Sequence, residues 1–275
     1  MSVWLRQPSN QIILLTAIAV AAILGTFGYQ YSAAYEAALA RAERDLRSAA
    51  GLLAEHTDRT FEAVEETLGA VARLREDAHA GRVAGDPETL HRYLAAIKGG
   101  SNVFKSLGWY GPDGRQVANS ISVQPLSISV AQQEHYRVHA EGSAGPGIHV
   151  AAPIRSARDG SWIAIVSIGM RDAEGRFAGT VSGAIDPEYF HRVFRGIELG
   201  KSLVVTLFRK DGVVMARHPG GEALLGQAPA AQNRQLVLAQ TSPRAVSRPG
   251  ASPTGPSGSS AMRWRWRPVS SSPWR

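Results

Sequence analysis

Residues 162–185 read WIAIVSIGMRDAEGRFAGTVSGAI, and this stretch decides the fold. Two apolar runs, 162–170 and 177–185, flank Asp172-Ala173-Glu174-Gly175, which has the composition of a turn. Two such runs joined by a short Gly-containing turn predict an antiparallel β-hairpin. We expect the sheet of this protein to be built around that hairpin.

Further strand and helix signals lie on both sides of the hairpin. Strands are expected at 103–110 and 116–121 around a Gly-Pro-Asp-Gly turn, at 148–154, and at 202–208 and 213–216 around an Asp-Gly turn. Helices are expected at 32–79, where apolar residues recur mostly at spacings of three, four and seven, at 87–97, at 131–140 and after Asp186-Pro187. This order predicts an α+β fold in which helices cover one face of an antiparallel sheet.

An uncharged apolar run, IILLTAIAVAAILGTFGY, occupies residues 12–29. About 20 residues of helix cross the hydrocarbon core of a bilayer, so the run predicts a transmembrane helix at 12–31. A cleaved signal peptide and a buried core helix are the alternatives, but a signal peptide usually has a shorter apolar region. Lys and Arg counts on the two sides of the run leave its orientation open.

Composition excludes several classes of site. The chain has no cysteine, which excludes disulfides, thiolate metal ligands and a Cys nucleophile. Its net charge of +7 arises in the tail, because residues 241–275 contain six Arg and no Asp, Glu or Lys. The remaining chain is nearly neutral, so we expect no nucleic-acid partner.

The ordered motifs resemble the double Cache (PAS-like) extracytoplasmic sensor domains of bacterial membrane receptors, of the diguanylate cyclase and histidine kinase type. The resemblance rests on LGWYGPDGRQVANS (107–120), HYRVHAEG (135–142), HVAAPI (149–154), WIAIVSIGMR (162–171), GRFAGTVSGAID (175–186), PEYFHRVF (187–194) and ARHP (216–219). Val138 stands where the family has a small residue, and Tyr-Arg stands where Tyr-Phe-Arg is common. The resemblance implies a PAS-like sheet behind a long N-terminal stalk helix, preceded by one transmembrane helix.

The resemblance also implies a domain order. Residues 1–11 are expected in the cytoplasm, 12–31 in the bacterial inner membrane as a single pass, and 32–198 as the stalk helix with a membrane-distal unit in the periplasm. Residues 199–238 are the start of an incomplete second unit. Residues 239–275, rich in Ser, Pro, Gly and Arg, are expected to be a disordered or out-of-frame tail, with a flexible linker or a membrane-surface patch as alternatives.

No catalytic motif is present, so neither an enzyme nor a cofactor is expected. His135 and His139 are four residues apart and share a helix face, but we expect surface histidines there and not a metal site. The resemblance implies a pocket for a small molecule such as an amino acid or organic acid. Arg137 could hold a carboxylate, and Asp186 could hold an ammonium group. The candidate ligand-binding residues are Trp109, Tyr136, Arg137, His139, Trp162 and Asp186.

Two hypotheses follow for function. The first is the small-molecule sensing input module of a membrane-bound receptor that lacks its output domain and could form a homodimer through the stalk helix. The alternative is a membrane-anchored interaction or dimerisation remnant of such a receptor that does not signal. A response to small molecules separates the two.

Overall fold

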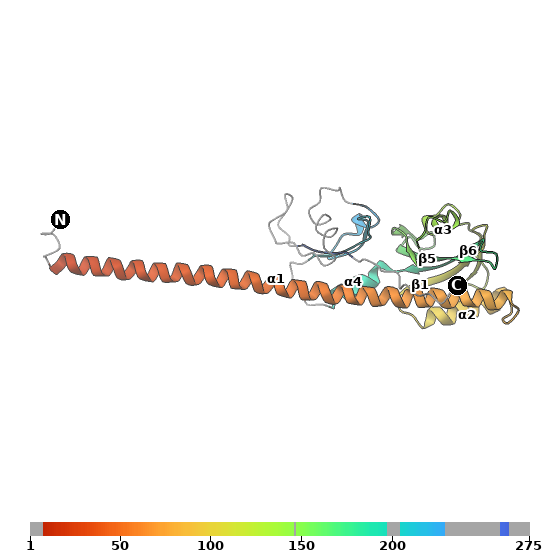
Figure 1. Ribbon diagram of the computed structural model, residues 1–275, viewed down its shortest axis with the longest axis horizontal. Coiled ribbons are helices and arrows are strands. Elements are labelled where there is room, and N and C mark those ends of the chain that lie inside the picture. Colours follow the sequence, from red (N-terminus) through yellow and green to blue (C-terminus); the bar gives the residue numbers. More distant parts are fainter. Residues whose placement is uncertain (1–7, 146, 197–203, 229–258, 264–275) are drawn as a thin grey trace. The chain divides into compact units, whose positions relative to one another are not determined.

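The computed structural model describes residues 8–145, 147–196, 204–228 and 259–263 (Figure 1). The chain divides into two compact units, residues 1–48 and 49–275. The predicted α+β class is confirmed. The helices are α1 (Pro8–His79), α2 (Pro87–Gly99), α3 (Glu134–Ala140), α4 (Pro187–Arg195) and the 3₁₀ helix η2 (Glu222–Leu224). The strands are β1 (Phe104–Tyr110), β2 (Gln116–Asn119), β3 (His149–Val150), β4 (Ile154–Arg155), β5 (Trp162–Arg171), β6 (Phe177–Ile185), β7 (Val204–Phe208), β8 (Val214–His218) and β9 (Ser259–Arg263).

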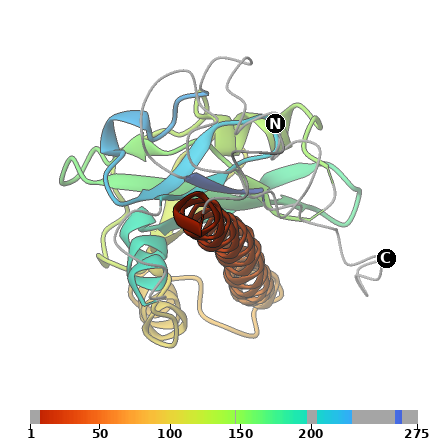
Figure 2. The same cartoon turned by 90° about the vertical axis from the view of Figure 1, so that its left-hand side faces the viewer.

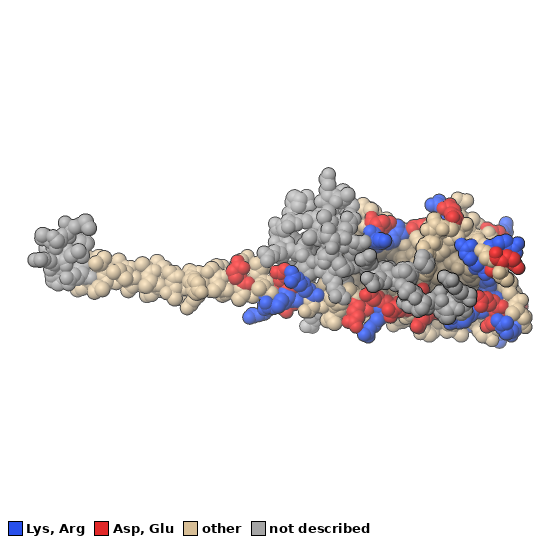
Figure 3. Space-filling view, viewed as in Figure 1, with Lys and Arg blue, Asp and Glu red and all other residues tan. Residues whose placement is uncertain are grey.

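Helix α1 is 72 residues long and carries two different patterns. Its first part contains one segment that could cross a membrane by length and composition, although a signal sequence would satisfy the same criteria. Figure 3 shows this part free of Lys, Arg, Asp and Glu. Within the second unit, α1 buries Leu53, Val64, Leu68 and Val71 in the core, as the helical spacing of its apolar residues predicts.

The main sheet is antiparallel, with strand order β2-β1-β6-β5-β3 and β4 paired to β5. The predicted hairpin is β5–β6, and it lies in the middle of this sheet. Figure 2 shows α1, α2 and α4 on one side of the sheet, whereas Figure 1 shows α3 on the other side. The expectation that all helices cover one face is therefore wrong for α3.

Side-chain alternation gives the two sheet faces different chemistry. On the α1 side, Leu107 and Trp109 of β1 lie opposite Gly183 and Val181 of β6, and Val166 of β5 follows. All but the glycine belong to the main hydrophobic cluster together with the buried residues of α1. The α3 side carries mainly polar and small residues, described below.

Both predicted Asp-Pro helix starts are confirmed. The Asp86 carboxylate accepts a hydrogen bond from the Thr89 N–H (2.9 Å) at the start of α2. Asp186 accepts one from the Glu188 N–H (2.9 Å) at the start of α4. In each case proline occupies the next position, where a backbone N–H would have no helical partner.

The strand expected at 148–154 is wrong as one element. It is divided into β3 and β4, and residues 151–153 belong to neither strand. Two features explain the break. Pro153 has no N–H to donate to a ladder, and the Ala152 N–H donates to the Glu134 carboxylate (3.2 Å).

A second, smaller sheet begins after residue 203. Strands β7 and β8 pair antiparallel around the predicted Asp211-Gly212 turn. Strand β9 pairs parallel to β7 and lies inside the segment that was expected to be disordered. The rest of that segment lies outside the described residues, so the prediction for the tail as a whole stays a prediction.

Candidate functional site

The face of the main sheet beneath α3 carries two rows of polar and small side chains. Directly paired residues of neighbouring antiparallel strands point to the same face, so the strand register identifies each row. The first row is Asn119, Gly108, Ser182, Ser167 and His149; the second is Gln116, Tyr110, Thr180 and Gly169. We call these nine residues the polar face.

Helix α3 lies over the polar face and directs His135 and His139 onto it. Their exposed fractions are 2% and 7%, so the expectation that both are surface histidines is wrong. Their i, i+4 spacing places them on one side of the helix, and that side meets the sheet. The described residues include no group of three or more His, Cys, Asp or Glu that could hold a metal ion.

Glycines allow this close approach. A Cβ atom at Gly169 would lie 3.0 Å from the His139 Cβ, so a side chain there would displace α3. The ring of Tyr110 bends back over Gly108, where a Cβ atom would lie 2.9 Å from the Tyr110 Cε2. The two glycines thus bring α3 and an aromatic ring close to the strands.

Hydrogen bonds fix one histidine tautomer. The Ser167 hydroxyl donates to the backbone oxygen of His135 (2.8 Å), which uses its only proton. His139 Nε2 lies 2.9 Å from the same hydroxyl oxygen, so Nε2–H must be the donor. The Nδ1 atom of neutral His139 is consequently an acceptor.

Two buried polar atoms in this region have no hydrogen-bond partner among the described residues: His135 Nε2 and Thr180 Oγ1. The His135 ring lies 6.2 Å from the Tyr110 ring, edge to face, and Thr180 is paired directly with Tyr110 in the sheet. Buried polar groups in folded proteins almost always have partners. An unpaired nitrogen and an unpaired hydroxyl beneath one helix therefore mark this face as a candidate site.

Burial keeps both histidines uncharged. Desolvation lowers the pKa of His135 from 6.5 to about 4, and repulsion from His139 and His149 acts in the same direction. Desolvation, with His149 next, also lowers the pKa of His139 to about 4. At pH 7 these two imidazoles are therefore unprotonated and bring no charge to the polar face.

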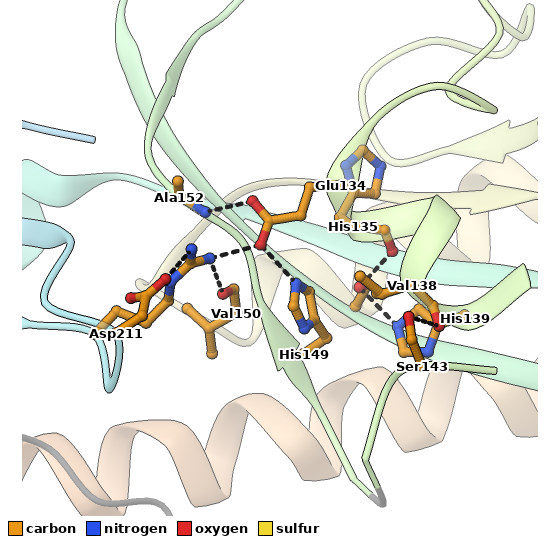
Figure 4. A network of polar contacts seen from close by, with 11 residues as sticks. Glu134, His135, Val138, His139, Ser143, His149, Val150, Ala152 and Asp211 are labelled. Atoms are coloured by element: carbon orange, nitrogen blue, oxygen red, sulfur yellow. Dashed lines mark hydrogen bonds and ion pairs between the residues drawn. The ribbon is translucent and has the colours of Figure 1, made fainter. Parts of the chain in front are cut away.

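Glu134, the first residue of α3, directs its carboxylate to His149, at the end of the first row of the polar face (Figure 4). Its carboxylate accepts from Arg209 Nη1 (2.7 Å), from His149 Nε2 (3.1 Å) and from the Ala152 N–H. Partial burial opposes ionisation of Glu134, but these donors outweigh it and hold the pKa below its ordinary value. Arg209 also donates to the Val150 oxygen (3.0 Å) and pairs with Asp211. We call the group Glu134, His149, Arg209 and Asp211 the bridge, because it joins α3 and β3 to the β7–β8 hairpin.

The structure brings only part of the predicted ligand set to α3. His139 lies on the polar face. Tyr136 is buried beside it in sequence, but its hydroxyl donates to the Gly111 oxygen (3.1 Å) and its ring packs on Phe177. The Arg137 side chain is 54% exposed and pairs with Glu141.

The other three candidates lie elsewhere. Trp109 is on the opposite sheet face, in the core and against His79 of α1. Trp162 packs against Phe208, Val214 and Leu225, beneath the Arg155 guanidinium, and its buried Nε1 lacks a partner in the described structure. Asp186 caps α4 and lies 3.5 Å from Lys105 Nζ. The six candidates are therefore not gathered at one place.

Sequence reasoning missed Tyr110, His135, Ser167, Thr180 and Ser182 as site residues. For Ser167, Thr180 and Ser182 the signal was the alternation of polar and apolar residues within β5 and β6, for example Thr180-Val181-Ser182. In a buried strand that alternates in this way, the polar side chains all point to one face, and that face does not join the apolar core.

Comparisons with known proteins agree with this fold. The Cache domain family model matches residues 31–275. The extracellular domain of rpHK1S-Z16, described as a histidine kinase, has a TM-score of 0.58 at 22% identity and covers 70% of this chain and 76% of its own. The ligand-binding domain of the Campylobacter jejuni chemoreceptor Tlp3 in complex with L-valine has a TM-score of 0.53 at 9% identity, covering 72% and 78%.

The ligand-binding domain of the Pseudomonas aeruginosa PAO1 amino acid chemoreceptor PctC, in complex with GABA, has a TM-score of 0.50 at 18% identity, covering 74% and 84%. A search of curated proteins returned no match. At these identities the structural likeness concerns the fold alone. The family match, however, includes most of the chain, and the protein therefore belongs to the Cache domain family of sensor domains.

Proposed function

We propose that this protein is the extracytoplasmic, small-molecule sensing input module of a membrane-bound bacterial signal-transduction receptor. The observation that carries the proposal is the polar face beneath α3, with His135 Nε2 and Thr180 Oγ1 both buried and unpaired among the described residues. A buried polar surface in a Cache fold has the character of a ligand site, since a few placed polar groups fix the orientation of a bound molecule.

The second part of the proposal concerns location. We propose that residues 12–31 span the inner membrane with the N-terminus inside, so that the polar face is in the periplasm. The apolar segment at the start of α1 supports a membrane anchor. Fusion of alkaline phosphatase after residue 150 tests the orientation, because the enzyme is active only outside the cytoplasm. An inactive fusion, with normal expression, contradicts the periplasmic location.

Ligand binding is tested by thermal unfolding of the full chain in detergent, screened against amino acids, organic acids, amides and polyols. A ligand at 100 times its Kd stabilises a protein by about 2.7 kcal/mol, which raises the Tm of a domain of this size by roughly 5–10 °C. We expect at least one compound to give such a shift.

A variant that fills the polar face tests whether the increase in Tm comes from ligand binding at this face or from binding elsewhere on the protein. Ser182→Val places an apolar side chain between Gly108 and Ser167, and we expect it to abolish the shift. Thr57→Val is the control, because Thr57 is equally buried but bonds to its own helix at the Leu53 oxygen. Equal shifts in both variants would place binding away from α3.

A further inference from the structure

The charged side chains near the polar face already have partners within the protein. The Glu134 carboxylate is committed to Arg209, His149 and the Ala152 N–H. Arg137 projects into solvent from the outer side of α3 and pairs with Glu141 (3.5 Å). None of these groups offers a free charge to a molecule beneath α3.

The polar face itself carries no fixed charge. Its nine residues include no Asp, Glu, Lys or Arg, and its one histidine, His149, is committed to the Glu134 carboxylate (3.1 Å). His135 and His139, which cover it from α3, are buried and neutral at pH 7. What the face offers is a set of uncharged donors and acceptors, among them the Tyr110 hydroxyl, which accepts from Gln116 Nε2 (3.3 Å), and the Thr180 hydroxyl.

A buried carboxylate or ammonium group needs an opposite charge, because desolvation of an unpaired ion is far more costly than desolvation of a neutral polar group. Neutral hydroxyl and amide groups need only hydrogen-bond partners. The chemistry of the polar face therefore matches a molecule with neutral hydroxyl or amide groups and disfavours a molecule with a carboxylate or ammonium group.

We propose that the ligand of this site is a small uncharged polar molecule, of the carboxamide or polyol class, and not an amino acid or organic acid. The inference rests on the proposed sensing function and narrows its ligand. The ligand donates to or accepts from Thr180 Oγ1 and His135 Nε2, and so satisfies the two atoms that lack partners in the described structure.

The experiment compares matched pairs that differ in charge but hardly in shape. Acetate with acetamide, propionate with propionamide, benzoate with benzamide, and ethanolamine with ethylene glycol are tested on the full chain in detergent at pH 7.5. Each pair is followed by thermal unfolding and by isothermal titration calorimetry. We expect the uncharged member of at least one pair to raise the Tm and its charged counterpart to leave it unchanged.

Thr180→Val is the diagnostic variant, since it keeps the shape of the side chain and removes the unpaired hydroxyl. Its own stability should be at least that of the wild type, because no hydrogen bond of the described protein is lost. We expect it to weaken binding of the uncharged compound at least tenfold, whereas Thr57→Val binds like the wild type. If Thr180→Val does not fold, Ser182→Ala serves in its place, since Ser182 is the next polar side chain on β6.

The outcomes distinguish the inference from the function on which it rests. Stronger binding of the charged member of a pair overturns the uncharged class but leaves ligand sensing intact. Equal shifts in wild type and Thr180→Val indicate a general cosolute effect and overturn the assignment to this face. The absence of binding by every compound, charged or uncharged, overturns the sensing function and the ligand class together.

Discussion

At the residue scale, His135 and His139 make the stability of the folded protein depend on pH. Both have a pKa of about 4 in the folded protein against 6.5 in the unfolded chain. Below pH 6.5 the unfolded chain takes up protons that the folded protein does not, so stability is constant above this pH and falls as pH decreases toward 4. Between pH 6.5 and 5 the loss is on the order of 2 kcal/mol per histidine.

Thermal unfolding at pH 7.5, 6.5, 5.5 and 5 tests this prediction, in a range where most carboxylates have not yet titrated. His139→Gln keeps a group that can donate to Ser167 and removes one titration, so its Tm should fall less steeply with acid. A wild-type Tm that stays level between pH 6.5 and 5 contradicts the neutral buried state of both rings.

Gly179 provides a second prediction at this scale. Its φ is +112°, and a Cβ atom there would overlap the Tyr110 backbone oxygen on the neighbouring strand. Gly179→Ala should therefore destabilise the protein by about 3 kcal/mol or more, because strain and overlap add. Gly51→Ala is the matched control: it lies in α1 with open space around it and should stabilise the helix by about 0.5–1 kcal/mol. Comparing the two denaturation midpoints tests the difference.

At the scale of the element, Asp86 starts α2 by accepting the Thr89 N–H. Asp86→Ala removes this partner and should lower the free energy of unfolding by about 1 kcal/mol. Asp86→Ser should retain most of the stabilisation that the cap contributes, because serine also accepts the hydrogen bond. Denaturant unfolding of the two variants measures the difference. Equal stability of Asp86→Ala and wild type would show that α2 is held by packing of Leu90 and Leu94 alone.

The elements differ in how well the sequence predicts them. Asp-Pro helix starts, Asp-Gly turns and the β5–β6 hairpin depend on neighbouring residues, so the local sequence is sufficient for them. The packing of α3 on the sheet depends on Gly169, and that of the Tyr110 ring on Gly108; these glycines are 34 and 27 residues from His135. No local pattern reveals that contact, and for this reason the histidines were expected at the surface.

The same limit applies to the candidate ligand residues. Tyr136 and Trp109 have the amphipathic side chains of a binding site, but their partners, Gly111 for the one and α1 for the other, are fixed by tertiary packing. The residue type of Thr180 does not by itself suggest a binding role, since threonine is common in strands. Alternation within β6 places Thr180 on the polar face, but its lack of a hydrogen-bond partner is visible only in the folded structure.

At the scale of the whole second unit, the bridge links the main sheet to the β7–β8 hairpin. Arg209 is 20% exposed and contacts Glu134, Val150 and Asp211. Arg209→Met should leave the Glu134 carboxylate without its closest cation and destabilise the protein by roughly 1–3 kcal/mol, less than a fully buried pair because Glu134 is partly exposed.

Hydrogen exchange locates this effect. Amides of residues 204–218 should exchange faster in Arg209→Met, while those of β5 and β6 remain protected. Arg176→Met is the control, because Arg176 forms a comparable pair with Asp172 at a 74% exposed position and should change stability by less than about 1 kcal/mol. Uniform loss of protection throughout the sheet would show that the bridge does not act locally.

The alternation of side chains along β1, β5 and β6 also bears on how such a protein can evolve. Successive positions of one strand contact different neighbours, so a change at Thr180 or Ser182 alters the face beneath α3 without altering Val181 in the core. New specificity can therefore arise through substitutions at these two positions that leave the packing of the core on the α1 side unchanged. A combinatorial library restricted to positions 180 and 182, which keeps the Ser167 hydrogen bonds to α3, should therefore contain many folded members with divergent preferences.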